Sequence, residues 1–169
     1  MAERTTWIVD RTEAVTSGGM VAAKSPWAAA AGVEVLRRGG NAIDAAVATS
    51  FAIGVAEPWM SGTGGGGFMV INRPGHEPVY VSFPMISPRA ATPDMFPLAG
   101  TAMVDGLGFG WPGVKDDANI SGPRSVAVPG TVAGMAVANE QFGTMPWADL
   151  IAPAIQLATE GPPVTWHTT

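Results

Sequence analysis

Cysteine is absent from this 169-residue chain, and histidine occurs only twice, at His76 and His167. The absence of cysteine excludes disulfides, thiolate metal sites and a cysteine nucleophile. Each histidine lies in a loop-like segment far from the other in sequence, so a histidine metal site or a Ser-His-Asp relay is not expected within the chain. We therefore expect no metal and no cofactor, and the chain offers no self-contained catalytic set.

Charged side chains are also scarce: they make up 14% of the residues, where about 25% is typical of soluble domains. Hydrophobic residues nevertheless make up 47% and the formal net charge is −5, so the chain has enough apolar side chain to fold. Its length fits one domain. A lone domain of this size needs a more charged surface to stay soluble, so we expect another polypeptide to cover part of it.

The same composition excludes several classes of partner. The sequence pI is near 4.8 and Arg37-Arg38 is the largest basic cluster, which argues against nucleic acid because phosphates require a basic surface. No apolar run of about 20 residues is free of glycine, proline and charge, so no membrane span is expected. The first ten residues are charged and lack the apolar segment of a secretory signal. We expect a cytoplasmic protein, with periplasmic or secreted locations left open.

Residues that cap helices and residues that interrupt helices or strands divide the chain into expected elements. Ser25 and Asn41 are placed to cap two helices, and Thr131 is placed to cap a third. The helix after Asn41 is apolar on nearly every face and must be covered all round. A kink is expected at Pro153. The expected order is an arm over 1–19, a strand over 20–23, helices over 26–38 and 42–56, a hairpin of strands 68–72 and 79–83, a loop over 84–129, and helices over 131–143 and 146–160.

Four consecutive glycines, Gly64–Gly67, precede the first hairpin strand. Consecutive backbone N–H groups can form an anion nest, but no Lys-Ser/Thr follows and a strand rather than a helix comes next, so the phosphate-loop pattern is not met. Glycine is tolerated where the backbone bends sharply or presses against another group. We interpret the run as a structural bend or a wall of an active site.

The segment GMVAAKSPWAAAAGVEVLRRGGNAIDAAVATSFAIGVAEPWMSGTGGGGFMVI closely resembles the N-terminal region of the gamma-glutamyltransferase family. The similarity continues in SPRAATPDMF, VAVPGTVAG and MPWADLIAPAIQLATEG, and so covers most of residues 19–164. The resemblance implies an α+β fold, the αββα four-layer sandwich of N-terminal-nucleophile (Ntn) hydrolases, completed by a second, small subunit. Family large subunits are usually considerably longer, so residues 20–169 are expected to be the first part of one.

The resemblance also implies where the chemistry lies. A precursor of this family cuts itself, and the new N-terminal threonine of the small subunit becomes the nucleophile. Its α-amine serves as the general base, so no histidine is required. No catalytic residue is then expected in this chain. The implied partners are that small subunit, from the same precursor, and a small-molecule amide substrate, and a dimer of heterodimers is a further expectation.

One departure from the family pattern concerns substrate choice. Family members that act on gamma-glutamyl compounds carry Asp-Phe-Arg-Glu at the end of the second hairpin strand, where the arginine binds the glutamate α-carboxylate. Here the segment is Ser82-Phe83-Pro84-Met85. Proline has no donor and methionine is apolar, whereas a bidentate charge-assisted clamp contributes about 1.5–3 kcal/mol. Its loss should weaken gamma-glutamyl binding at least about tenfold.

Two hypotheses follow for the acyl group. In the first, the substrate is not glutamyl, and Phe83, Met85 and the loop containing Phe109 and Trp111 shape a more apolar pocket around Pro84. The family that the chain resembles includes members of this sort, the cephalosporin-type acylases and small-amide hydrolases. In the second, Arg89 or Arg124 supplies a relocated cation for a gamma-glutamyl substrate. A third hypothesis is a homologue that no longer cuts itself and serves as a binding or scaffold protein.

Overall fold

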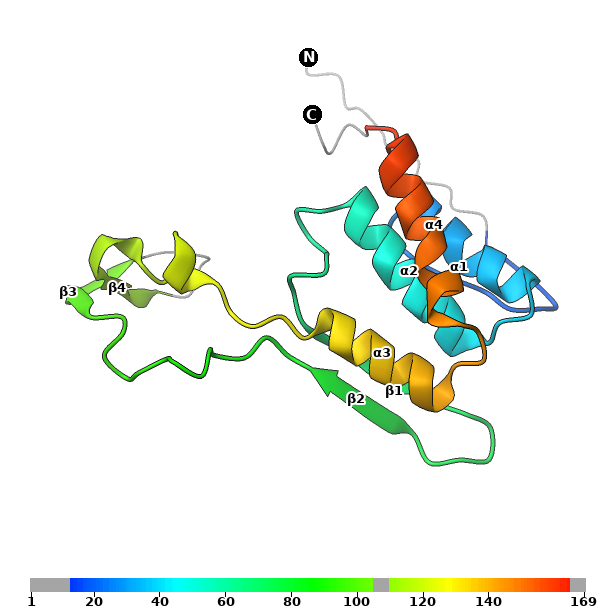
Figure 1. Ribbon diagram of the computed structural model, residues 1–169, viewed down its shortest axis with the longest axis horizontal. Coiled ribbons are helices and arrows are strands. Elements are labelled where there is room, and N and C mark those ends of the chain that lie inside the picture. The colour runs from blue at the N-terminus through cyan, green and yellow to red at the C-terminus, as the bar shows by residue number, and fades with distance from the viewer. Residues whose placement is uncertain (1–12, 105–109, 165–169) are drawn as a thin grey trace, which may run out of the picture.

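The structure, a computed structural model, describes residues 13–104 and 110–164. Four helices and a two-stranded hairpin form one body, and a second hairpin lies apart from it (Figure 1). Among the described residues, no helix is long and apolar enough to cross a membrane. The elements of the body are α1 (Pro26–Arg37), α2 (Ala42–Ala56), β1 (Gly67–Ile71), β2 (Val79–Phe83), α3 (Thr131–Phe142) and α4 (Trp147–Glu160).

The core joins every element of the body. Large apolar side chains from the helices meet the inward residues of the hairpin, and Val35 and Leu150 are among the fully buried side chains. Alanines make a second, tighter cluster where α1, α2 and α4 meet, because small side chains let helix backbones approach closely. The main cluster consists of Val35, Ile43, Ala45, Val47, Ala48, Ile71, Phe83, Met135, Ala138 and Leu150.

The β1–β2 hairpin has one covered face and one bare face. The strands pair antiparallel with Met69 opposite Val81, and burial alternates along both of them, as the two-residue period of a strand requires. The inward residues pack on the helices. On the other face Phe68, Val70 and Tyr80 are 67%, 63% and 60% exposed, and the rings of Phe68 and Tyr80 lie 5.7 Å apart. Nothing in the described chain covers this apolar face.

The predicted loop over 84–129 is wrong in one respect, because the segment contains a second hairpin. Strands β3 (Leu98–Val104) and β4 (Trp111–Val114) pair antiparallel with an irregular register. Two short 3₁₀ turns follow, at Lys115–Asp117 and Pro123–Ser125. Glycines and Pro112 interrupt the alternation of apolar residues that identifies a strand, which hid the hairpin from sequence reasoning. We call residues 87–127 the arm, which is distinct from the N-terminal arm expected over residues 1–19. The β3–β4 hairpin of this arm lies away from the helices (Figure 1).

The helix starts differ in how they are capped. Asn41 caps α2 as expected: its Oδ1 accepts from the N–H groups of Ile43 and Asp44, and Asp44 accepts from the N–H of Asn41. Ser25 is the N-cap residue of α1, but its buried hydroxyl has no hydrogen-bond partner among the described residues. The prediction that Thr131 caps α3 is wrong, since Gly130 is the N-cap and Thr131 is the first helical residue.

Two other expectations also change. Residues 20–23 form no strand, because no neighbouring strand is present there among the described residues to complete a ladder.

Helix α2 packs against α1, α3 and α4, yet Ala42 and Ala46 remain exposed, so this helix is not covered all round within the described chain. Residues 13–19 have no regular secondary structure, and the domain boundary at residue 19 stays a prediction. Helix α4 continues through Pro153, as expected, and the kink at that residue stays a prediction.

Candidate functional site

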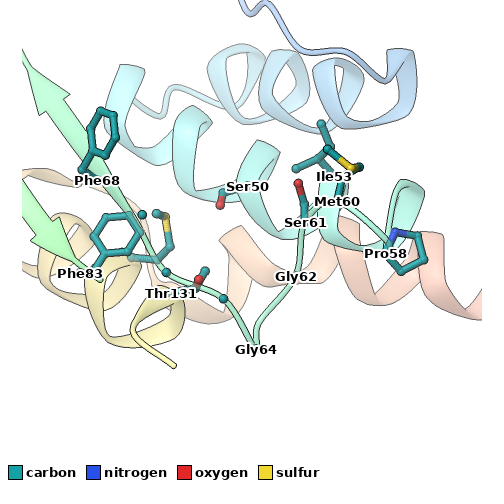
Figure 2. Close-up of a pocket in the computed structure, with 14 residues that line it drawn as sticks. Ser50, Ile53, Pro58, Met60, Ser61, Gly62, Gly64, Phe68, Phe83 and Thr131 are labelled. Atoms are coloured by element: carbon teal, nitrogen blue, oxygen red, sulfur yellow. The ribbon is translucent and has the colours of Figure 1, made fainter. Parts of the chain in front are cut away.

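The candidate site lies where β2 ends beside the glycine run. Phe83, the last residue of β2, is 8% exposed and forms part of the wall of a pocket of ≈ 480 Å³. Figure 2 shows the pocket between α2, the glycine-rich segment and the start of α3. Its lining residues are Ser50, Ile53, Pro58, Met60, Ser61, Gly62, Gly64, Gly65, Gly66, Gly67, Phe68, Phe83, Thr131 and Met135.

The polar groups of this pocket are uncharged. Ser50 from α2, Ser61 from the segment after α2 and Thr131 from α3 contribute hydroxyl groups. Within the described residues, none of these three hydroxyls has a hydrogen-bond partner, and no charged side chain lines the pocket. The pocket can therefore offer hydrogen bonds to a neutral polar group, but it holds no cation that would bind a carboxylate by charge.

Close packing against the end of β2, rather than an unusual backbone conformation, explains the glycines of this run. None of Gly64–Gly67 has a positive φ, so the left-handed region does not explain these glycines. A Cβ on Gly66 would lie 2.5 Å from the N atom of Met85, and one on Gly67 would lie 3.0 Å from the Phe83 ring. Two glycines of the run thus lie directly against the end of β2, while Gly64 has open space around it.

The structure places the predicted pocket residues at different positions around this site. Phe83 is buried and lines the pocket. Pro84 and Met85 follow it directly and are exposed, Met85 by 56%. Arg89 is also exposed and lies farther along the chain, at the beginning of the arm. The segment after β2 is held by an antiparallel bridge in which Ile86 and Val128 exchange two backbone hydrogen bonds, of 3.1 and 2.9 Å.

The two aromatic residues predicted to complete the pocket are not brought to it within the described chain. Trp111 is the first residue of β4, on the hairpin of the arm, and it is 58% exposed. That hairpin lies apart from the β1–β2 hairpin and the helices (Figure 1). Phe109 lies outside the described residues. A contribution of Trp111 and Phe109 to the acyl pocket stays a prediction.

Sequence reasoning missed the residues from α2 and α3 that line the pocket, Ser50, Thr131 and Met135. It also missed Gly130 and Gly134, which lie against Phe83. Their spacing of four residues was a usable signal, because residues four apart share one face of a helix. Two glycines on one face at the start of a helix indicate a close neighbour.

No metal centre is found in residues 13–104 and 110–164, where no three acidic or histidine side chains gather in a geometry that could hold an ion. The buried carboxylate of Asp44 lies at the start of α2, where hydrogen bonds from Asn41, Asn139, Thr144 and Met145 surround it. It is therefore a structural group, and it does not line the candidate pocket.

Comparison with known proteins agrees with this arrangement. The family model described as gamma-glutamyltranspeptidase matches residues 28–169. The chain is 36% identical over 148 residues to the glutathione hydrolase proenzyme of Pseudomonas aeruginosa, covering 88% of this chain and 24% of that protein. It is 41% identical over 156 residues to the acylase ACY 1 proenzyme of Pseudomonas sp. strain V22, covering 92% of this chain and 27% of that protein.

A solved structure gives the fold. The gamma-glutamyltranspeptidase of Helicobacter pylori superposes with a TM-score of 0.79 at 37% identity, over 93% of this chain and 42% of that one. The chain spans about a quarter of the length of the curated relatives above. The fold is that of the α+β Ntn hydrolases, and the chain belongs to the gamma-glutamyltranspeptidase family.

Proposed function

We propose that this chain is the N-terminal part of the large subunit of a self-processing amidohydrolase that cleaves a small amide or acyl-amide. The observation that carries the proposal is the family match over residues 28–169, combined with a chain that lacks cysteine and has only two histidines. An N-terminal threonine on a second chain from the same precursor supplies the nucleophile. Catalysis then requires neither residue type here.

The proposed reaction proceeds through an ester. The threonine hydroxyl loses its proton to the α-amine of the same residue, and its oxygen bonds to the acyl carbon of the substrate. The C–N bond of the amide breaks, and the departing amine takes the proton from the α-ammonium group. Water then adds to the ester, releases the carboxylic acid and restores the hydroxyl. This chain contributes walls and positioning, and the nucleophile stays on the partner.

The bare face of the hairpin supports the existence of that partner. Phe68, Val70 and Tyr80 form an exposed apolar face on a sheet of only two strands, and an isolated hairpin is at best marginally stable in water. Stacking a second sheet on this face at about 10 Å would bury it. Such a sheet is the inner layer that an αββα sandwich requires, and it would also account for the chain's low charge.

The residues after Phe83 support a substrate other than gamma-glutamyl. Pro84 stands where the family motif has its carboxylate-binding arginine, and Met85 stands where the motif has an acid. The adjoining pocket is lined by hydroxyls and apolar groups, without a cation. Relatives named as acylase and relatives named as glutathione hydrolase match the chain about equally well, so family membership alone does not choose between them.

The alternative is a gamma-glutamyl hydrolase or transpeptidase with a relocated cation. Arg89 suits this role better than Arg124. The guanidinium of Arg124 donates to the carbonyl of Met95 at 3.4 Å within the arm. Arg89 is exposed and makes no ion pair with any described residue. It also follows Pro84 by only five positions. This alternative gains support if Arg89→Gln weakens gamma-glutamyl binding selectively.

Mass spectrometry of the complete protein tests the proposed class. Self-processing predicts two chains from one precursor, the smaller beginning with threonine, and a threonine-to-alanine change at that position should leave the precursor uncut. A precursor that stays whole and inactive under conditions in which it folds would contradict the proposal. That outcome would favour the binding or scaffold homologue instead.

Restoring the family residue at position 84 tests the assignment of the acyl pocket. We expect Pro84→Arg to increase gamma-glutamyl affinity about tenfold, because a charge-assisted clamp contributes about 1.5–3 kcal/mol. Inhibition by free glutamate, measured as a Ki in the complete enzyme, provides the readout. Pro84→Gln is the matched control, since it also removes proline but adds no charge, and the gain of about tenfold in affinity is expected for Pro84→Arg relative to Pro84→Gln. An unchanged Ki in correctly folded Pro84→Arg would show that the pocket lies elsewhere.

A further inference from the structure

The backbone that leaves β2 runs through a narrow slot between two glycines. A Cβ on Gly66 would lie 2.5 Å from the N atom of Met85, 2.7 Å from the carbonyl carbon of Pro84 and 2.8 Å from the carbonyl oxygen of Phe83. A Cβ on Gly130 would lie 2.6 Å from the carbonyl oxygen of Pro84 and would overlap the carbonyl of Phe83. Contacts under 3.0 Å force something to shift, and here the neighbouring atoms are backbone.

Hydrogen bonds hold the two walls of this slot together. The N–H of Gly130 donates to the carbonyl of Gly65 at 2.9 Å, and the N–H of Thr131 donates to the same carbonyl at 3.2 Å. Just beyond the slot, the bridge between Ile86 and Val128 fixes the departing chain. The slot is therefore closed on both sides and secured at its exit.

Proline at position 84 restricts the same segment further. Its ring fixes φ near −65°, and it confines the preceding residue to extended conformations. Phe83 is buried and anchored from within the core, while Pro84 and Met85 are exposed. The segment thus joins a fixed anchor to two outward-facing side chains with little freedom between them.

We propose that Gly66 and Gly130 are positioning residues that set acyl-group specificity. They fix the backbone of residues 83–85, so that the side chains at positions 84 and 85 meet the substrate in a single arrangement. The inference rests on the proposed function, in which positions 84 and 85 form a wall of the acyl pocket. It adds that the close approach of two glycines, rather than those side chains alone, determines which acyl group fits.

The experiment compares alanine substitutions at the two glycines that line the slot with an alanine substitution at a glycine outside it, in the complete, processed enzyme. Gly66→Ala and Gly130→Ala place a methyl group against the backbone of residues 83–85. Gly18→Ala is the control, because its added Cβ would meet only the Thr16 hydroxyl at 3.9 Å, its φ is not positive, and it does not line the candidate pocket. The substrates are gamma-glutamyl-p-nitroanilide and butyryl-p-nitroanilide, which share the acyl chain length and differ in the amino and carboxylate groups.

The readout is the ratio of kcat/KM for the two substrates. This ratio does not depend on how much of the enzyme is folded, so a merely structural role would leave it unchanged. We expect the ratio to change at least about fivefold in Gly66→Ala and Gly130→Ala, since small displacements of positioning groups cost large factors in rate. In Gly18→Ala the ratio should stay within about 1.5-fold. An unchanged ratio in all three active variants would overturn the proposal.

A second variant covers the case in which the alanine variants do not fold. Pro84→Gly adds no atoms and releases the fixed φ inside the slot, so it should also shift the ratio. If Pro84→Gly folds and keeps the wild-type ratio, the proposal is wrong.

Amide hydrogen exchange separates failure of this inference from failure of the proposed function. If the wild-type protein cleaves neither substrate, the function proposal is contradicted, but the slot can still be measured. The slot predicts that amide exchange at Ile86 and Val128 accelerates at least about tenfold in Gly66→Ala and stays unchanged in Gly18→Ala. Equal exchange in the two variants would show that the slot does not fix this segment.

Discussion

Asp44→Asn is expected to destabilise the protein by about 3 kcal/mol or more. The Asp44 side chain is fully buried, and its carboxylate accepts hydrogen bonds from Asn41, Asn139, Thr144 and Met145. The shortest joins the Thr144 hydroxyl to Oδ2 at 2.6 Å. Hydrogen bonds to a charged group contribute about 1.5–3 kcal/mol each, and the amide NH₂ of asparagine would face donors instead of accepting from them. Chemical denaturation of the complete protein measures the loss.

The Asp44 carboxylate also predicts the acid limb of stability. Burial raises its pKa, but the hydrogen bonds from Thr144, Asn41 and Met145 outweigh burial and hold the pKa below the ordinary value of 3.8. A group with a lowered folded-state pKa stabilises the protein above its unfolded-state pKa and loses that contribution as pH falls through the folded-state pKa. The stability difference between wild type and Asp44→Asn should therefore be largest near neutral pH and shrink below about pH 4.

Asp149→Asn is the matched control for this prediction. Asp149 pairs with Arg38 at 3.5 Å, and both side chains are more than 40% exposed. Exposed ion pairs contribute about 0–1 kcal/mol, so the same chemical change should have little effect there. Equal losses in the two variants would contradict the structural role assigned to Asp44.

Gly134→Ala is expected to destabilise the protein by about 1–3 kcal/mol, the usual cost of overpacking a core. Gly134 is buried in α3, and an added Cβ would overlap the Cβ, Cγ and Cδ1 atoms of Phe83. Glycine-to-alanine changes in an open helix position stabilise by up to about 1 kcal/mol, so a net loss must come from this overlap. Thermal and denaturant unfolding of the complete protein measure it.

Gly65→Ala is the matched control for Gly134→Ala. Its added Cβ would meet its nearest neighbours at 3.6 and 3.7 Å, which is ordinary van der Waals contact. Its free energy of unfolding should change by less than about 0.5 kcal/mol. If Gly134→Ala proves as stable as wild type, α3 does not pack on β2 as described.

Local signals predicted much of the body of the fold. Asn41 caps α2 as expected and forms a capping box with Asp44, and Gly39, which has a positive φ, follows the end of α1. The two strand segments on either side of the turn Arg73-Pro74-Gly75 also predicted the β1–β2 hairpin. Each of these features depends on residues that are close in sequence, so the local sequence is enough to specify it.

Features that depend on distant contacts were predicted less well. The hairpin of the arm was not predicted, because glycine and proline interrupt the alternation of apolar residues in its strands. Residues 20–23, expected to be a strand, do not pair with another strand among the described residues. The hydroxyls of Ser50 and Thr131 meet at the pocket although 81 positions separate them. The close contact of Gly66 and Gly130 with the backbone of residues 83–85 depends on three segments that are far apart in sequence, so the sequence alone does not predict it.

The substrate preference of the complete enzyme decides whether its acyl pocket accepts a group other than gamma-glutamyl. The measurement compares kcat/KM for gamma-glutamyl-p-nitroanilide and butyryl-p-nitroanilide, which lacks the amino and carboxylate groups that a glutamate site recognises. With Pro84 and Met85 in place of a charged clamp, we expect the enzyme to cleave the amide and to prefer the butyryl substrate. Rapid turnover of the gamma-glutamyl substrate, at least about tenfold faster in kcat/KM, would contradict it.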